Sequence, residues 1–135
     1  MKALAVAVVT VSVVTGLVLV GPPSEERARK LDERRVEDLR RLGTAVDLYR
    51  SRRGSLPSSL NEASRETEDV RTVGDPLTGR PYPYRVVGAD DYELCADFQR
   101  GSGNSGTDRR YSEPAFWAHT AGPQCFRMKP GGLPH

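Results

Sequence analysis

The chain has 135 residues, of which 28% are charged, and a formal net charge of +2 at pH 7. This length has room for one domain, and so small a positive excess does not favour nucleic acid as a partner. The average conceals a division, because residues 3–20 carry no charge whereas the remainder is rich in arginine and carboxylates.

The N-terminal residues 3–20 form one apolar run. As a helix this run would extend roughly 27 Å, close to the thickness of the hydrocarbon core of a membrane, about 30 Å. We therefore interpret residues 1–23 as a membrane anchor that ends at Pro22 and Pro23. A cleaved signal peptide, with Lys2 in its charged first part, is the main alternative, and a buried core helix is the third.

Two features oppose each other on the orientation of the domain, residues 24–128. More basic residues follow the apolar run than precede it, which favours the cytoplasmic side. Two cysteines in a small domain, in neither a metal-binding nor a redox spacing, favour a disulfide and hence an oxidising compartment. We give the cysteines more weight and predict a domain outside the cytoplasm.

A helix is predicted for residues 24–53. Ser24 is a capping residue, acidic residues follow it in the first turn, and Gly54 comes directly after a basic last turn. Apolar residues recur at helical spacing and become denser over 36–49, so this later half should pack on the domain. Arg35 interrupts the apolar stripe, and the earlier half is expected to be solvated.

A small antiparallel sheet is predicted within residues 81–128. A short second helix around residues 60–66 and a turn-rich segment, 67–80, precede it. Alternating aromatic and polar residues over 82–86 and 92–98 predict a hairpin, and the prolines near the first strand place that strand at an edge. Apolar segments at 116–119 and 125–128 are expected to add strands, residues 99–112 to form a flexible loop, and residues 129–135 to be a disordered tail. The predicted fold class is α+β, with the long helix packed on the sheet.

The order of these elements carries a resemblance to a known family. A long helix after an apolar N-terminus, then G-x-L-P-x-x-L, then D-P-x-T-G-x-P-Y-x-Y, then a hairpin, resembles the major-pseudopilin-like proteins of type II secretion systems. The matching residues are Gly54, Leu56, Pro57, Leu60, Asp75, Pro76, Gly79, Pro81, Tyr82 and Tyr84. The resemblance implies a type IV pilin-like fold and a single-pass protein of the bacterial inner membrane with a periplasmic domain.

The sequence also departs from that family. The prepilin-peptidase site of the family, a glycine followed by Phe or Met with Glu at the fifth mature position, is missing: Gly16 precedes Leu17, and Gly21 stands where the glutamate is needed. We therefore expect a chain that is not processed. The segments Tyr-Glu-Leu-Cys-Ala, Trp-x-His and Gly-x-x-Cys-Phe also resemble uncharacterised membrane-anchored bacterial proteins.

Few residues indicate chemistry. Cys95 and Cys125 are expected to form a disulfide, which would stabilise the domain by about 3–4 kcal/mol; two free buried thiols are the alternative. Trp117 and His119 are candidates for facing a ligand, although the sequence favours a half-buried histidine near the disulfide and a core tryptophan. A further alternative is a loose calcium site formed at the Gly-rich loop by Asp97, Asn104 and Asp108. The spacing of these residues is not that of an EF-hand.

The sequence therefore predicts a non-enzymatic protein without a cofactor. No nucleophile and base, and no set of metal ligands, occur together once the cysteines pair. The expected partners are the membrane and other envelope proteins, in a structural or interaction role. The alternative is an envelope module that binds a small ligand or a cell-wall component through aromatic side chains on the sheet.

Overall fold

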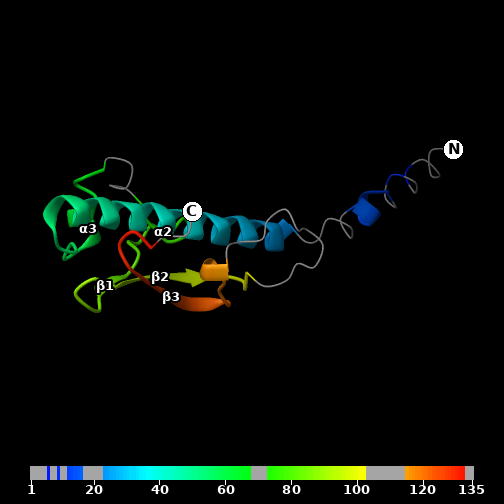
Figure 1. Ribbon diagram of the computed structural model, residues 1–135. Coiled ribbons are helices and arrows are strands. Elements are labelled where there is room, and N and C mark those ends of the chain that lie inside the picture. The colour runs from blue at the N-terminus through cyan, green and yellow to red at the C-terminus, as the bar shows by residue number, and fades with distance from the viewer. Residues whose placement is uncertain are drawn as a thin grey trace.

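The computed structural model describes residues 6, 9, 12–16, 23–67, 73–102 and 115–132. The elements follow one another as α2 (Pro23–Arg53), α3 (Leu60–Ala63), β1 (Tyr84–Val86), β2 (Tyr92–Phe98), the 3₁₀ helix η3 (Ala115–Trp117) and β3 (Gly122–Met128). The long helix lies across one face of a small sheet (Figure 1). The predicted α+β class, a long helix with a small antiparallel sheet, is confirmed.

The ends of α2 follow the capping chemistry read from the sequence. Acidic residues occupy its first turn and arginines its last, so both ends suit the helix dipole. Gly54 has a φ of +79°, a left-handed conformation that glycine adopts without steric cost. Its N–H donates to the carbonyl of Arg50 at 2.9 Å. The helix thus ends at the residue that the sequence predicts.

Three antiparallel strands form the sheet in the order β1-β2-β3. β2 and β3 are seven residues each and pair along their whole length. β1 has three residues and follows Pro81 and Pro83, which agrees with its predicted place at an edge.

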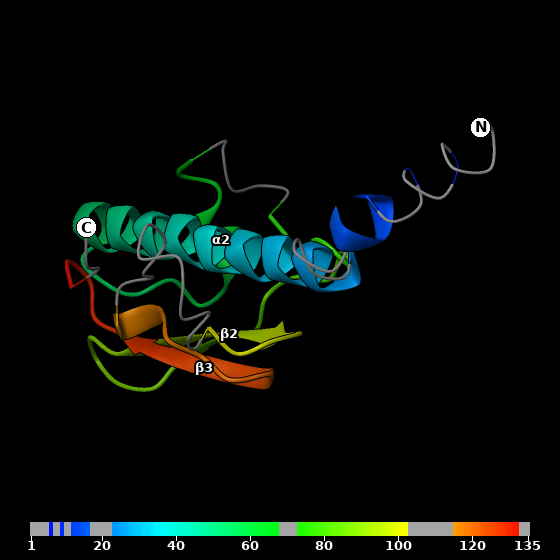
Figure 2. The same cartoon turned by 90° about the vertical axis from the view of Figure 1, so that its right-hand side faces the viewer.

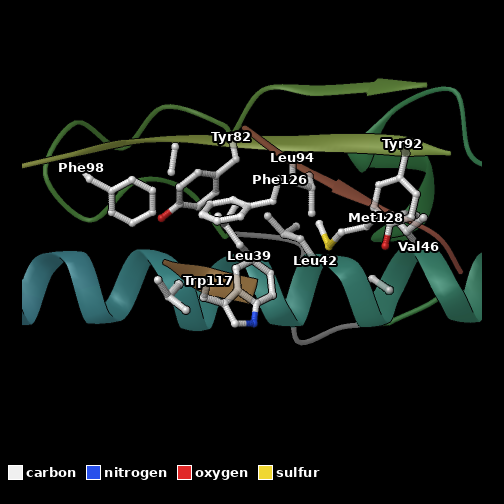
Figure 3. Close-up of a cluster of buried hydrophobic side chains, with 14 residues drawn as sticks. Leu39, Leu42, Val46, Tyr82, Tyr92, Leu94, Phe98, Trp117, Phe126 and Met128 are labelled. Atoms are coloured by element: carbon white, nitrogen blue, oxygen red, sulfur yellow. The ribbon is translucent and has the colours of Figure 1, made fainter. Parts of the chain in front are cut away.

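α2 lies over one face of the sheet (Figure 2), and the hydrophobic core fills the layer between them (Figure 3). Buried residues alternate with less buried ones along β2, because successive side chains of a strand point to opposite faces. The core includes Leu39, Leu42 and Val46 from α2 and Tyr92, Leu94, Phe98, Phe126 and Met128 from the strands. Each such side chain contributes about 1.5–3 kcal/mol when fully buried, so the later half of α2 is held on the sheet as predicted.

Residues 116–119 do not add the strand that the sequence suggested. Ala115–Trp117 form η3 instead, with the Trp117 side chain 0% exposed and the neighbouring Phe116 side chain 37% exposed. The Trp117 ring packs 5.0 Å from the Phe126 ring, measured between centroids. One turn of 3₁₀ helix is enough to carry this indole into the core beside α2 (Figure 3).

The beginning of the predicted disordered tail, residues 129–132, forms a turn. The N–H of Gly132 donates to the carbonyl of Lys129 at 3.0 Å, and the backbone of Gly131 donates to the carboxylate of Asp47 on α2. These bonds bring the chain back to α2 (Figure 1). The glycines that suggested disorder here serve a turn, in which Gly131 has a φ of +75°.

Most of the predicted anchor, residues 1–23, lies outside the described residues, as do 103–112 of the predicted loop and 133–135 of the tail. Among the residues that are described, no helix combines the length and the apolar character needed to cross a membrane.

Candidate functional site

A buried ionic cluster lies where the first half of α2 meets the turn of the Asp-Pro motif. It consists of Asp32, Arg35 and Asp75, and we call it the Arg35 cluster. The side chains of Arg35, Asp32 and Asp75 are 3%, 7% and 11% exposed. Arg35 occupies the position where the apolar stripe of the helix is interrupted, so the helix directs it toward the domain rather than toward solvent.

The Arg35 guanidinium bridges the two carboxylates. Its Nε donates to Oδ2 of Asp75 at 2.5 Å, and its Nη1 donates to Oδ1 of Asp32 at 2.7 Å. Asp32 also accepts the backbone N–H groups of Gln99 and Arg100 at 3.0 and 2.8 Å, just beyond β2. The cluster therefore joins three separate segments: the helix, the Asp-Pro turn and the end of β2.

Asp75 also shapes its own turn. Its Oδ1 accepts the N–H groups of Leu77 and Thr78 at 3.0 and 2.9 Å, and its carbonyl accepts the N–H of Gly79 at 2.8 Å. Gly79 has a φ of +68°, and Pro76 stands where the fixed φ of proline suits a turn. The predicted turn motif is thus an Asp-centred loop whose second carboxylate oxygen, Oδ2, accepts a hydrogen bond from Arg35 on the helix.

The two motif tyrosines hold the hairpin onto the helical segments. The hydroxyl of Tyr82 donates to Oδ2 of Asp38 on α2 at 3.0 Å. The hydroxyl of Tyr84 donates to the carbonyl of Pro57 at 2.9 Å, in the Gly-x-Leu-Pro turn that follows Gly54. Asp75 and Tyr82 therefore bind α2 and Tyr84 binds Pro57 in the turn after it, while Gly54 bonds to Arg50 at the end of the helix.

Burial and hydrogen bonding set the protonation of this region. Burial alone would raise the pKa of Asp75, but hydrogen bonds from Arg35 and from the N–H groups of Thr78 and Leu77 outweigh it and lower the pKa to about 2. Burial raises the pKa of Asp38, and the hydrogen bond from Tyr82 only partly offsets this effect. The low pKa of Asp75 and the raised pKa of Arg35 therefore keep this pair charged over the ordinary pH range.

The low pKa of Asp75 predicts a loss of stability in acid. A carboxyl group with a folded pKa below its usual 3.8 stabilises the fold above that value, and the contribution disappears as the pH falls toward about 2. Because one pKa unit corresponds to about 1.4 kcal/mol, we expect about 2 kcal/mol to be lost over this range. Urea unfolding at pH 5 and pH 2 measures this loss of stability.

Asp75→Asn should flatten the dependence of the unfolding free energy on pH. Asp97→Asn, which changes an exposed carboxyl of β2, is the control and should not. The same pH dependence in the original chain and in both variants would contradict the prediction.

The predicted disulfide is present. Cys95 and Cys125 lie directly opposite each other in β2 and β3, with a Cα–Cα distance of 4.0 Å. Their neighbours along β2, Leu94 and Ala96, are buried toward α2, so the disulfide lies on the face of the sheet that points away from the helix.

Trp117 and His119, the candidates for facing a ligand, are both buried. An Arg40 guanidinium lies 5.7 Å from the centre of the Trp117 ring, and the indole nitrogen has no hydrogen-bond partner among the described residues. The His119 ring stacks on Phe98 at 3.7 Å, and its Nδ1 lies 2.8 Å from the carbonyl of Trp117. Neither ring is presented to solvent, because each fills core space beside the sheet.

The loose calcium site is only partly described. Asp97 is exposed on β2, whereas Asn104 and Asp108 lie outside the described residues. In the ranges that are described, no three His, Cys, Asp or Glu side chains stand close enough together to hold a metal ion.

No family model, curated protein or solved structure matches this chain. Its function is inferred from its own residues.

Sequence reasoning missed the burial of Asp32 and Arg35. A charged stretch of helix is usually solvated, so both residues were expected in the solvated first half. The available signal was register: Arg35 continues the apolar spacing of Leu39 and Leu42, and Asp32 lies one turn before it. A charged residue on an apolar stripe, together with an Asp-centred turn later in the chain, indicates a buried ion pair.

Proposed function

We propose that this protein is a non-enzymatic, membrane-anchored envelope protein with a pseudopilin-like domain, and that it acts by contacting other envelope proteins. The domain would lie outside the cytoplasm on the bacterial inner membrane, anchored by residues 1–23. The missing peptidase site at Gly16 and Leu17 makes this domain a stationary one, not a processed filament subunit.

The proposal rests on the contacts that the residues of the Asp-Pro and Tyr-x-Tyr motif make. In the resembled family the motif comes after a helix that rises from the membrane. Here Asp75 binds Arg35, Tyr82 binds Asp38, and Tyr84 binds the Pro57 carbonyl. The motif thus fastens a turn and a hairpin to one long helix. Its polar groups are engaged in holding the fold, which supports a structural role for the domain.

The alternative, a module that binds a ligand through aromatic side chains, receives less support from the burial of these rings. Tyr82, Tyr92, Phe98 and Trp117 are between 0% and 4% exposed. Phe116 is the one exposed aromatic side chain among the described residues.

The topology is tested by labelling thiols in spheroplasts that express the full chain. We expect an added protease to digest the domain, and Cys95 and Cys125 to react with a membrane-impermeant maleimide only after reduction. Because a disulfide forms and persists in oxidising compartments, free labelling without reductant in a protease-protected domain would overturn the proposed location.

The interaction role is tested by photo-cross-linking in the host membrane. A photoreactive residue replaces Arg41 on the exposed side of α2 or Arg85 on the outer face of the sheet, both solvent-exposed. We expect reproducible adducts with other envelope proteins from at least one site. The same residue at the buried Leu39 is the control and should give none. The absence of adducts from both exposed sites would contradict an interaction role through the helix or the sheet face.

A further inference from the structure

The outer edge of β3 has backbone groups that bond to no other backbone group of the described residues. The N–H of Cys95 donates to Pro83 on the β1 side, so the pair Cys95–Cys125 is not a hydrogen-bonded pair of the β2–β3 ladder. The N–H groups of Cys125 and Arg127 therefore point away from β2, as do the carbonyls of Pro123, Cys125 and Arg127. Outside helices and ladders, no backbone bond among the described residues engages these groups. We call them the open edge of β3.

This edge is longer and less protected than the opposite one. β1 has only three residues and is preceded by two prolines, whereas β3 has seven. Edge strands with free N–H and C=O groups readily accept a strand from another chain unless they are short, charged or covered. Pro123 removes one donor at the start of β3, but two consecutive outward donors remain toward its end.

An open hollow of about 560 Å³ lies at that end of β3. It is lined by Asp91, Phe116, Arg127, Met128, Lys129 and Gly132. Phe116, an exposed apolar ring beside the sheet, supplies apolar surface, and Met128, which is 4% exposed, lines the hollow on the core side. The Arg127 side chain is 62% exposed, and its ion pair with Asp91 is long, with 3.5 Å between Nε and Oδ1. With Lys129 the rim has two cations and one anion, a net positive charge.

We propose that the open edge of β3 docks an extended segment of a partner protein as an added strand, with a large apolar side chain next to an acidic one. This proposal rests on the proposed interaction role and names its surface. Backbone hydrogen bonds to Cys125 and Arg127 supply the affinity of strand addition, and the pocket for alternate side chains supplies the specificity. The apolar side chain enters the hollow against Phe116 and Met128, and the carboxylate meets Arg127 and Lys129.

A second copy of this chain fits the edge less well than a foreign strand does. β3 contains no acidic residue, so a second β3 brings no carboxylate to Arg127 and Lys129. In an antiparallel pairing centred on Cys125, the carbonyl of each Arg127 would also face the Pro123 of the other copy, which has no N–H to donate. The positive charge of Arg127 and Lys129 favours an acidic partner segment, and the missing N–H of Pro123 disfavours a second copy of β3.

The open edge is first tested by amide hydrogen exchange on the purified full chain in detergent micelles. We expect the N–H groups of Cys125 and Arg127 to exchange at least tenfold faster than those of Gln124 and Phe126, which face β2. Equal protection of all four at low concentration would show that the edge is already covered and would overturn the proposal. Protection that appears only at high concentration, together with dimers in sedimentation, would replace the partner segment with a second copy.

The partner chemistry is tested by selecting random twelve-residue peptides on the immobilised full chain. We expect enriched peptides to carry an acidic residue next to a large apolar one, and to slow exchange of the Cys125 and Arg127 amides. Arg127→Glu should weaken their binding at least tenfold, and Arg85→Glu, on the same face of the sheet at the far edge, less than twofold. Phe116→Ser is a second variant, outside the ladder, that should also weaken binding.

Two outcomes would overturn this assignment: no enrichment, or selected peptides that bind Arg127→Glu as tightly as the original chain. Photo-cross-linking at Arg41 separates the two proposals. Adducts at Arg41 with a failed β3 test would leave the interaction role standing and reject only this surface, whereas the absence of adducts at both Arg41 and Arg85, together with a failed β3 test, would reject the role itself.

Discussion

Arg35→Ala is expected to lower the free energy of unfolding by about 3–5 kcal/mol. Removing the guanidinium leaves Asp32 and Asp75 buried without their shared cation. The loss of one partner from a buried ion pair is more costly than the net worth of the pair, because the remaining charge stays desolvated. Urea unfolding of the full chain at pH 7, followed by Trp117 fluorescence, measures the change.

The matched control is Arg34→Ala, which removes the same side chain from the adjacent, exposed position of α2. Surface substitutions of this kind usually change stability by no more than about 0.5 kcal/mol. If Arg34→Ala and Arg35→Ala cost the same, Arg35 is not buried as described here. Asp75→Asn, alone and combined with Arg35→Ala, completes a double-mutant cycle. A coupling energy near zero would show that the two side chains do not interact in solution.

The helix and the core were predictable because their signals are local. A stripe of apolar residues at helical spacing, bounded by acidic residues at one end and Gly54 at the other, specifies both the extent of α2 and its buried face. The alternation from Tyr92 to Phe98 likewise specifies β2, whose even positions are buried. In these segments one residue type repeats at the period of the element, so no knowledge of distant residues is needed.

The Arg35 cluster was not predictable in the same way, because its partners are far apart in the sequence. Arg35 and Asp75 are separated by 40 positions, and Asp32 binds backbone groups 67 and 68 positions away. Read singly, each charge belongs on a solvated helix face or in a turn. Only the tertiary contact makes their burial favourable, by supplying a hydrogen bond to each oxygen.

The segment before β3 shows a second limit of reading by pattern. The sequence predicts a strand over residues 116–119, but an apolar run bounded by turns has no distinctive period. The structure buries Trp117 and His119 and leaves Phe116 partly exposed. Packing around one indole, which no local signal encodes, decides this conformation.

Replacing both Cys95 and Cys125 with serine is expected to lower the free energy of unfolding by about 3–4 kcal/mol, since the bond closes a loop with a sequence separation of 30. The loop contains η3 and its buried Trp117, so the unfolded chain without the bond gains much of its freedom there. Chemical unfolding with and without reductant measures the effect. Reductant should bring the original chain to the stability of the double variant and leave the variant unchanged; an original chain that is insensitive to complete reduction would contradict the prediction.

The disulfide and Arg35 stabilise the domain through different states, and the slope of the unfolding transition separates them. The disulfide acts mainly on the unfolded chain, which it keeps compact, so its removal should expose more surface on unfolding and raise the dependence of the free energy on urea. Arg35→Ala acts on the folded state, where it leaves two carboxylates unpaired, so its slope should stay as in the original chain. If the double serine variant keeps the original slope while Arg35→Ala changes it, the two stabilising roles assigned here are reversed.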